Sequence, residues 1–404
     1  MSVLPLSRYR VVDFGMAYAG GQPGQLLADM GAEVIKVESR RHLDGIRIGN
    51  PGKGISDPEE RRPTFHCVAR NKLDVTLDIT QPEAQALVKR LVAQSDVVLE
   101  NFSPGIMARN NIDYASLRQV NPQLVMVSLS AAGQNGPLRD IVVYAPAMAA
   151  LSGLDSVVGY EGGDVTGLRT AYGDATGAIY GVIATLVGLY RRNRTGRGQY
   201  VDLSEWEATT TTMGEVLLEY VLTKRVPQPR SNYHPDMAPY GNYPCNGNDR
   251  WVAIAVKTEE EWAGLCRAMG NPTWCREARF ADRFQRLRHI RELDPLVGRW
   301  TTQHTPEETT HVLQQEGVAA APVLTYAEQY ADPHFKARRT YEQVDHPRLP
   351  GEVIYGIPLK LSRTPGSIRR PAPLVGEHNA YVFRELLGLS DADVQRLAEA
   401  GVIH

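Results

Sequence analysis

The sequence predicts an α/β protein with a large domain around a mostly parallel sheet and a second, smaller α+β domain. Short β-branched runs alternate with amphipathic helix patterns in the first half of the chain, as in successive βαβ units. The chain has 404 residues, more than one hydrophobic core usually organises. Two Pro-rich segments, 226–241 and 332–373, interrupt the pattern and indicate linkers. We therefore expect 1–225 to form the large α/β domain, 226–325 to contain a linker and the small domain, and 326–404 to contain a second linker and C-terminal helices.

The elements of the first half follow from hydrophobic periodicity. Strands are expected at Val11–Phe14, Glu33–Glu38, Val75–Asp78, Asp96–Glu100 and Leu124–Leu129. Helices are expected at Gln25–Met30, where Gly31 ends the pattern, at 82–94, and in a long segment ending near Arg192. Strands and helices that alternate over this length predict a parallel sheet covered by helices.

The small domain is expected between the two linkers. Strands are predicted at Trp251–Val256 and Ala320–Leu324, and helices at 259–269 and 307–316. Thr258 and Thr305 precede these helices at positions where a hydroxyl caps the first turn. Two last helices are expected at 379–386 and 391–400.

Composition excludes several classes of protein. A hydrophobic content of 43% and a charged content of 22% are typical of globular enzymes. A net charge of −2 gives no basic field for nucleic acid or an anionic membrane. The four cysteines lack the spacing of metal ligands or of a disulfide framework, so we expect no metal site and a cytoplasmic location. The N-terminal residues lack a secretion signal, and no apolar run is long enough to span a bilayer.

Familiar catalytic and cofactor motifs are absent. The glycines between Gly15 and Gly24 do not fit G-x-G-x-x-G, although Glu38 ends the second strand where a ribose-binding acid would lie. The sequence has no G-x-S-x-G, H-E-x-x-H or P-loop motif. Arg40 and Arg109 follow strand ends, where they either bind a phosphate or lie on the solvated surface.

Asp174 is the most informative carboxylate of the chain. It lies between Gly173 and Gly177 at the head of a long helix pattern, and no cation follows before Arg191. Asp is a favoured N-cap, so a structural role is one interpretation. The other is chemical, because an ionised carboxylate can attack a thioester without a base, and glycine N–H groups can stabilise the oxyanion that forms. The spacing of Gly177, Gly181 and Thr185 also predicts close approach of another backbone.

Several stretches together resemble the family III CoA-transferases, a group that includes formyl-CoA:oxalate and carnitine CoA-transferases and the related α-methylacyl-CoA racemases. The resemblance runs nearly end to end. It rests on 25-QLLADMGAEVIKVE-38, 74-DVTLDI-79, 100-ENFSPGIMAR-109, 121-NPQLVMVSLSAAGQNGP-137, the pair Gly173-Asp174, 194-RTGRGQYVDLSEWEA-208 and 375-VGEH-378.

The resemblance implies roles for named residues. Asp174 would form an acyl anhydride and then an aspartyl-CoA thioester, with Gly173 and Gly177 at the oxyanion. The positions that would bind CoA are the Tyr18-Ala19 loop, Arg40, the stretch from Leu77 to Thr80, Asn101, Phe102, Ser103, Arg109 and Tyr144. Tyr144 stands where the racemases carry a histidine, which disfavours racemase chemistry. The segment 241–250 lacks the glycine-run loop of formyl-CoA transferases, so formyl or oxalyl substrates are not expected.

The resemblance also implies an architecture and partners. A large Rossmann-like domain would be made from both chain ends, and two linkers would let two ring-like subunits interlock as a homodimer. The substrates would be an acyl-CoA and a small carboxylic acid, with no cofactor beyond the CoA thioester. Two alternatives remain: an acyl-CoA racemase or epimerase, and a non-catalytic acyl-CoA-binding subunit that forms a heteromer with a paralogue.

Overall fold

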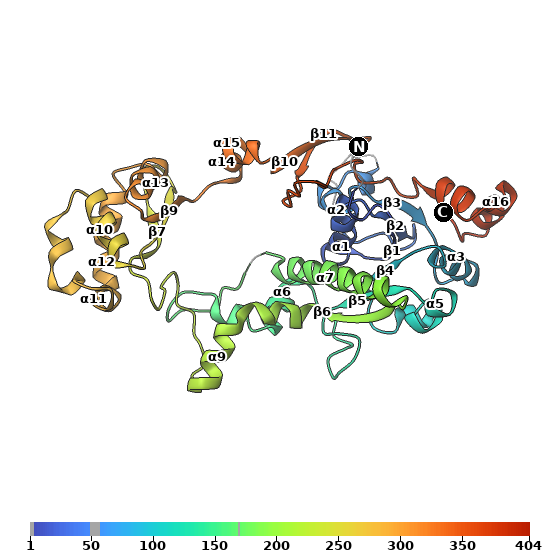
Figure 1. Ribbon diagram of the computed structural model, residues 1–404, viewed down its shortest axis with the longest axis horizontal. Helices are drawn as coiled ribbons and strands as arrows, with labels where there is room; N and C mark the ends of the chain where they lie inside the picture. Colours follow the sequence, from blue (N-terminus) through green and yellow to red (C-terminus); the bar gives the residue numbers. More distant parts are fainter. Residues whose placement is uncertain (1–3, 49–56, 169) are drawn as a thin grey trace. The chain divides into compact units, whose positions relative to one another are not determined.

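The computed structural model describes residues 4–48, 57–168 and 170–404, which divide into two units (Figure 1). The N-terminal segment was predicted to lack a secretion signal, and its first three residues lie outside these ranges. Unit 1 comprises the residues up to Asp155, Gly167–Pro227 and His334–His404, and unit 2 comprises Ser156–Thr166 and Gln228–Pro333. The sequence placed a linker and the small domain at 226–325 and did not reveal the contribution of Ser156–Thr166. That short segment joins unit 2 through the backbone N–H of Glu161, which donates to Ser231 Oγ at 2.8 Å.

Unit 1 is built on a six-stranded sheet with the order β3-β2-β1-β4-β5-β6. Every neighbouring pair is parallel, as the alternation of strands and helices predicted. The strands are β1 (Arg10–Asp13), β2 (Glu33–Glu38), β3 (Leu73–Thr76), β4 (Val97–Glu100), β5 (Val125–Ser130) and β6 (Gln199–Ser204). The order reverses between β1 and β4. In sheets of this kind, ligands bind at the carboxyl ends of the strands beside that reversal.

Unit 1 contains α-helices that mostly pack against the sheet or against one another. They are α1 (Ala17–Asp29), α2 (Pro63–Ala69), α3 (Pro82–Val92), α4 (Ile106–Arg109), α5 (Tyr114–Val120), α6 (Ala145–Leu151), α7 (Tyr172–Thr195), α8 (Glu205–Thr210), α9 (Gly214–Thr223) and α16 (Asp391–Glu399). A π-helical turn, η6, spans Ala380–Leu386. Within the described ranges, no helix is both long and apolar enough to cross a membrane.

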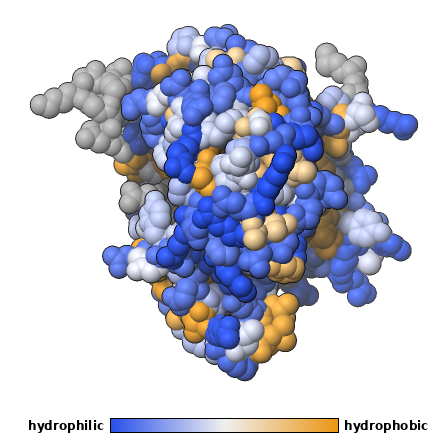
Figure 2. Space-filling view, turned by 90° about the vertical axis from the view of Figure 1, so that its left-hand side faces the viewer, coloured by the Kyte–Doolittle hydropathy of each residue, from blue (hydrophilic) through white to orange (hydrophobic). Residues whose placement is uncertain are grey.

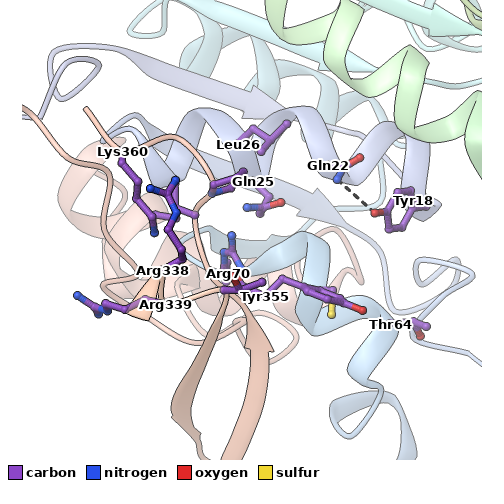
Figure 3. Close-up of a pocket in the computed structure, with 15 residues that line it drawn as sticks. Tyr18, Gln22, Gln25, Leu26, Thr64, Arg70, Arg338, Arg339, Tyr355 and Lys360 are labelled. Carbon is purple, nitrogen blue, oxygen red and sulfur yellow. Dashed lines mark hydrogen bonds between the residues drawn. The ribbon is translucent and has the colours of Figure 1, made fainter. Parts of the chain in front are cut away.

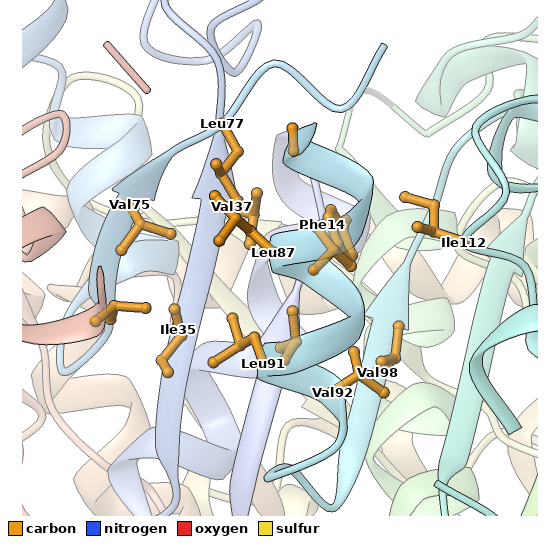
Figure 4. Packing of buried hydrophobic residues seen from close by; sticks show 14 of the residues in the cluster. Phe14, Ile35, Val37, Val75, Leu77, Leu87, Leu91, Val92, Val98 and Ile112 are labelled. Carbon is orange, nitrogen blue, oxygen red and sulfur yellow. The ribbon is translucent and has the colours of Figure 1, made fainter. Parts of the chain in front are cut away.

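The main core of unit 1 lies between α3 and the sheet. Figure 4 shows Leu87 and Leu91 of α3 packed over Ile35 and Val37 of β2. The same buried cluster includes residues from the C-terminal segment: Val382, Phe383, Leu387, Leu397, Val402 and Ile403. Both ends of the chain therefore build the large unit.

Helix α1 begins earlier than the sequence predicted. The expected helix started at Gln25, whereas α1 starts at Ala17 and includes Gly20, Gly21 and Gly24. Glycine disfavours helix by about 1 kcal/mol relative to Ala, so packing must compensate. It does so because Gly20 has no side chain and the side chain of Asn101 occupies the space where a Cβ would lie.

The predicted approach at the glycines of α7 is confirmed. A Cβ on Gly181 would lie 3.3 Å from Cγ of Pro23 in α1. Farther along α7, Gly188 lies directly on the side chain of Val125 in β5. These positions bring α7 close to both α1 and the sheet.

Unit 2 contains a three-stranded antiparallel sheet in the order β7-β8-β9. Its elements are β7 (Tyr240–Pro244), β8 (Trp251–Ala255), α10 (Glu259–Ala268), α11 (Arg283–Arg288), α12 (Ile290–Thr301), α13 (Pro306–Gln315), β9 (Ala319–Pro322) and α14 (Tyr326–Ala331). Thr258 and Thr305 form capping boxes with Glu261 and Glu308, as predicted for these helix starts.

The segment 332–373 is more ordered than the linker predicted from its composition. It contains the short helix α15 (Pro333–Ala337) and an antiparallel hairpin of β10 (Tyr341–His346) and β11 (Leu349–Tyr355). The carboxylate of Glu352 in β11 contacts the buried imidazole of His66 in α2, with an Nδ1–Oε2 distance of 2.7 Å. This contact fixes the hairpin to unit 1.

Candidate active site

Asp174 is the third residue of α7, not its N-cap. The N-cap is Ala171, which makes no side-chain capping bond, so the capping interpretation of Asp174 is wrong. The carboxylate is half-buried and has no hydrogen bond to any of the described residues. Burial raises the pKa of Asp174 above its usual range. An acid without a structural partner beside a cavity is a candidate for chemistry.

A cavity of about 230 Å³ lies at Asp174. It is lined by residues that follow four strands of the sheet: Ala17 after β1, Asn101 after β4, Ala131 after β5 and Glu205 after β6. We call it the Asp174 cavity. It therefore lies at the carboxyl ends of the strands beside the reversal of strand order, where ligands are expected.

Five of the predicted CoA positions line the Asp174 cavity: Ala19, Asn101, Phe102, Ser103 and Tyr144. Asn101 is fixed by the start of α1, because its Oδ1 accepts the N–H of Met16 at 2.8 Å and its Nδ2 donates to the carbonyl of Met16 at 3.0 Å. Tyr144 precedes α6 and is 83% exposed, so its ring is accessible.

A second cavity, of about 290 Å³, opens beyond the ends of β2 and β3. We call it the Leu77 cavity. Leu77 and Thr80, both predicted CoA positions, line it together with Phe14 and Ser39. Phe102 lines both cavities, so the two are neighbours.

The two predicted arginines are exposed beside the Leu77 cavity and do not line it. Arg109 lies between Ile106 and Asn110, which both line that cavity. Its guanidinium forms no ion pair with the described part of the chain. Arg40 follows Ser39 and donates to the carbonyl of Val375 at 3.4 Å. Both cations therefore lie outside the cavity, next in sequence to residues that line it.

Tyr18 and Ala19 lie on the first turn of α1, not in the predicted loop. The Tyr18 side chain lines a third cavity of about 630 Å³ (Figure 3), and burial together with the nearby Cys67 and Asp174 raises the pKa of its hydroxyl. Its hydroxyl accepts a hydrogen bond from Gln22 at 3.2 Å. Arg338 and Lys360 lie at the other end of this groove.

Gly173 and Gly177 occupy different positions in α7. Gly173 is the second residue, where the N–H has no carbonyl partner within the helix. Gly177 is the sixth, where an α-helical N–H bonds to the carbonyl of Gly173. The geometry therefore argues against Gly177 as an oxyanion donor. A Cβ on Gly177 would lie 2.8 Å from Cγ of Glu205, so this glycine makes room for that side chain.

Glu205 is the site residue that the sequence did not reveal. It is the first residue of α8, directly after β6, and is 6% exposed. Burial, and then the nearby Asp174, raise the pKa of Glu205 to about 8. Its position directly after a strand is the sequence signal that could have indicated Glu205, because ligands bind at the carboxyl ends of parallel strands.

The family assignment follows from comparison with known proteins. Residues 6–379 match the model of CoA-transferase family III. The chain belongs to this family. As a family III enzyme it is a CoA-transferase.

Individual relatives cover the whole chain. A succinyl-CoA–D-citramalate CoA-transferase of Chloroflexus aurantiacus is 36% identical over 99% of this chain and 98% of its own length. The β subunit of a succinyl-CoA–L-malate CoA-transferase from the same organism is 32% identical over 100% of this chain and 99% of its own. The crystal structure of a CaiB/BaiF family protein from Brucella suis superposes with a TM-score of 0.86, at 30% identity, over 96% of this chain and 100% of that one.

Proposed function

We propose that this CoA-transferase moves CoA from an acyl-CoA donor to a small carboxylic acid, with Asp174 as the nucleophile. The observation that supports this is the position of Asp174, which faces a cavity at the strand ends with no hydrogen bond to the described residues. A half-buried carboxylate without donors is a better nucleophile than a fully solvated one.

The proposed reaction is balanced without another reagent. One Asp174 oxygen attacks the thioester carbonyl, and the C–S bond breaks. CoA leaves as a thiolate, and a mixed anhydride of Asp174 and the donor acid is formed. The thiolate attacks the Asp174 carbonyl, giving an aspartyl-CoA thioester and releasing the donor acid as a carboxylate. The acceptor carboxylate attacks this thioester and forms a second anhydride. The thiolate then attacks the acceptor's acyl carbon, and Asp174 is regenerated.

The start of α7 supplies donors for the oxyanions. Gly173 and Asp174 are its second and third residues, where N–H groups lack helical partners and the helix dipole is positive. Oriented N–H groups stabilise charge that develops in a transition state. We propose the N–H of Gly173 for this role. Gly177 is not proposed as an oxyanion donor, because its N–H is bonded within the helix.

CoA would extend from the Leu77 cavity to the Asp174 cavity. Phe102 lines both and offers its ring to the ligand between them. Arg40 and Arg109 would lie at the outer end, where the phosphates of CoA need cations. Asn101, Ser103 and Tyr144 would then contact the part of CoA nearest the thioester. Tyr18 would act from the neighbouring groove.

The proposal for the donor and acceptor acids rests on the names of two relatives and on one arginine, Arg139. The two relatives described above are named for succinyl-CoA and for hydroxydicarboxylic acids. Arg139 lines the Asp174 cavity, half exposed and 3.2 Å from Asp140. It could pair with the second carboxylate of such a substrate. We therefore propose succinyl-CoA as donor and a small dicarboxylic acid as acceptor.

An exposed apolar surface supports a dimer. No residue of α9 is buried. Figure 2 shows hydrophobic side chains at the lower end of the molecule, where α9 lies in Figure 1. The large exposed apolar residues of α7 and α9 are Tyr172, Ile179, Ile183, Leu186, Val187, Tyr190, Leu217, Leu218, Tyr220, Val221 and Leu222. Large exposed apolar patches mark interaction surfaces. We propose a second copy of the chain as the partner, interlocked as the resemblance implies. The subunit name of one relative makes a heteromer with a paralogue the alternative.

The deciding experiment is chemical trapping. The protein is incubated with succinyl-CoA, treated with hydroxylamine or borohydride, and digested for mass spectrometry. Modification of Asp174 supports the proposal, whereas turnover without any modified aspartate would contradict it. Incorporation of deuterium at the α-carbon of a branched acyl-CoA in heavy water would instead favour a racemase. Absence of turnover alone, with activity on addition of a paralogue, would favour the binding-subunit alternative.

A further inference from the structure

Glu205 and Asp174 line one cavity from two different helices. Glu205 opens α8 after β6, and Asp174 lies in the first turn of α7. The side chain of Glu205 packs over Gly177, three residues after Asp174 and thus on the same face of α7. The fold therefore brings two carboxyl groups together at the proposed reaction centre.

No cation neutralises this pair within the described ranges. The other ionisable groups that line the cavity are Tyr144 and Arg139, and both are mostly exposed. Arg139 already pairs with Asp140. Glu205 makes no side-chain hydrogen bond or ion pair with the described residues. Two carboxylates in a poorly solvated site cannot both ionise easily, so the more buried one keeps its proton.

Burial identifies which acid keeps the proton. Glu205 is 6% exposed, whereas Asp174 is only half-buried. The pKa of Glu205 is raised to about 8, first by burial and then by Asp174, while that of Asp174 is raised by burial alone. Of the two acids, Glu205 is therefore the one expected to hold a proton at neutral pH, which leaves Asp174 as the acid that ionises first.

We propose that Glu205 is a second catalytic residue, which acts in its neutral form as a hydrogen-bond donor in the Asp174 cavity. This rests on the proposed nucleophilic role of Asp174. The Glu205 O–H donates to the carbonyl oxygen on which negative charge develops as each anhydride or thioester is attacked. The proton stays on Glu205 throughout, so the reaction balance is unchanged.

The test compares three variants with the wild type. Glu205→Gln keeps a neutral donor of similar size, Glu205→Ala removes it, and Glu207→Gln is a control at an exposed position of the same helix. Steady-state rates are measured from pH 6 to pH 10 with succinyl-CoA and a dicarboxylate acceptor. Intact-mass trapping of the Asp174 adduct is done in parallel, and thermal unfolding reports whether each variant is folded.

The proposal expects the wild-type kcat to fall above pH 8, about tenfold per pH unit, as Glu205 ionises. Glu205→Gln should keep a large part of kcat at pH 7 and lose this alkaline decline. Glu205→Ala should lose roughly a hundredfold in kcat, the effect of removing one oxyanion donor. Glu207→Gln should match the wild type in both rate and pH profile.

Two results would overturn the inference. One is a Glu205→Gln variant as inactive as Glu205→Ala, because the neutral amide would then not replace the acid. The other is an alkaline decline that persists unchanged in Glu205→Gln, which can be scored even if Glu205→Ala does not fold. Either result alongside a trapped Asp174 adduct refutes only the role of Glu205. Turnover with no adduct on Asp174 refutes the proposed nucleophile itself.

Discussion

The backbone of Gly20 in α1 lies against the side-chain amide of Asn101 at the end of β4, and any Cβ on Gly20 would overlap that amide. The amide in turn holds Met16 by two hydrogen bonds of 2.8 and 3.0 Å. One missing methyl group thus sets the distance between the first helix and the strand end that carries predicted CoA residues.

Gly20→Ala should therefore damage both stability and CoA binding. The methyl must displace either Asn101 or α1, and overpacking of this kind costs about 1–3 kcal/mol. Chemical denaturation measures the stability change, and calorimetric titration with CoA measures the affinity. Gly214→Ala is the matched control, because nothing lies near the position of its Cβ. A Gly20→Ala variant with wild-type stability would show that the contact is not tight in solution.

Asp174→Asn should abolish transfer without harming the fold. The loss in kcat should be at least roughly a thousandfold, as expected when a nucleophile is removed. Asp174 has no hydrogen bond to the described residues and its charge is partly desolvated, so a neutral amide should leave the melting temperature equal or higher. Substantial turnover by a folded Asp174→Asn protein, purified away from any deamidated form, would exclude the proposed nucleophile.

Glu205 should make stability depend on pH. Its pKa rises from 4.5 to about 8 in the folded state, so between these values the unfolded chain loses a proton that the folded chain retains. This contribution to the free energy of unfolding is fully present below pH 4.5 and is lost as pH rises towards 8. Glu205→Gln should remove the dependence and be more stable than the wild type at pH 8, by an amount on the order of a few kcal/mol. Parallel denaturation curves at pH 5 and pH 8 give the comparison.

Phe102→Ala should weaken CoA binding. The ring lies 6.3 Å from that of Phe14 and lines both cavities, so its removal takes away the surface proposed to lie under the ligand. We expect the Kd for CoA to rise roughly tenfold, which corresponds to about 1.4 kcal/mol. Phe284→Ala in unit 2 is the control, since Phe284 is 71% exposed and belongs to neither cavity. An unchanged Kd would mean that CoA takes another route.

Leu222→Glu should dissociate the proposed dimer. Leu222 is 73% exposed on α9, and a charge would be costly at an apolar interface. Sedimentation velocity should show the wild type as a dimer and the variant shifted towards monomer. Phe284→Glu places the same charge at a similarly exposed site and should remain dimeric. A monomeric wild type would contradict the homodimer.

The parallel sheet was predictable because its strands are short, apolar and separated by amphipathic helices, and these local patterns survive in the fold. The start of α1 was not, because two of the glycines that argue for a loop are required by contacts with residues far along the chain, Gly20 with Asn101 and Gly21 with Val68. The β10–β11 hairpin was hidden by Pro and Gly in its sequence. It is held by the long-range contact between Glu352 and His66.

The residues of the candidate site were likewise predictable only in part. Asp174 stood out because its glycine-flanked setting at a helix start is local, and the resemblance implied that Asn101 and Phe102 bind CoA. Glu205 did not stand out, because its meaning depends on burial and on the parallel pairing of β6 with β5, which no local pattern encodes. Tyr18 was expected in a loop that binds CoA, but it lies on the helical first turn of α1 and its side chain lines the neighbouring groove.

The hydrophobic cluster under α3 includes Phe383, Leu397 and Val402. A ribosome that has finished β6 has made every strand of the main sheet, yet it must still synthesise all of Gln228–Pro333 before these residues emerge. During that interval α3 covers only part of the cluster, and the apolar residues that pack on the C-terminal segment stay exposed. We expect newly made chains to depend on chaperones at this stage, and premature stop codons after α15 to yield insoluble protein with all six strands of the main sheet already made.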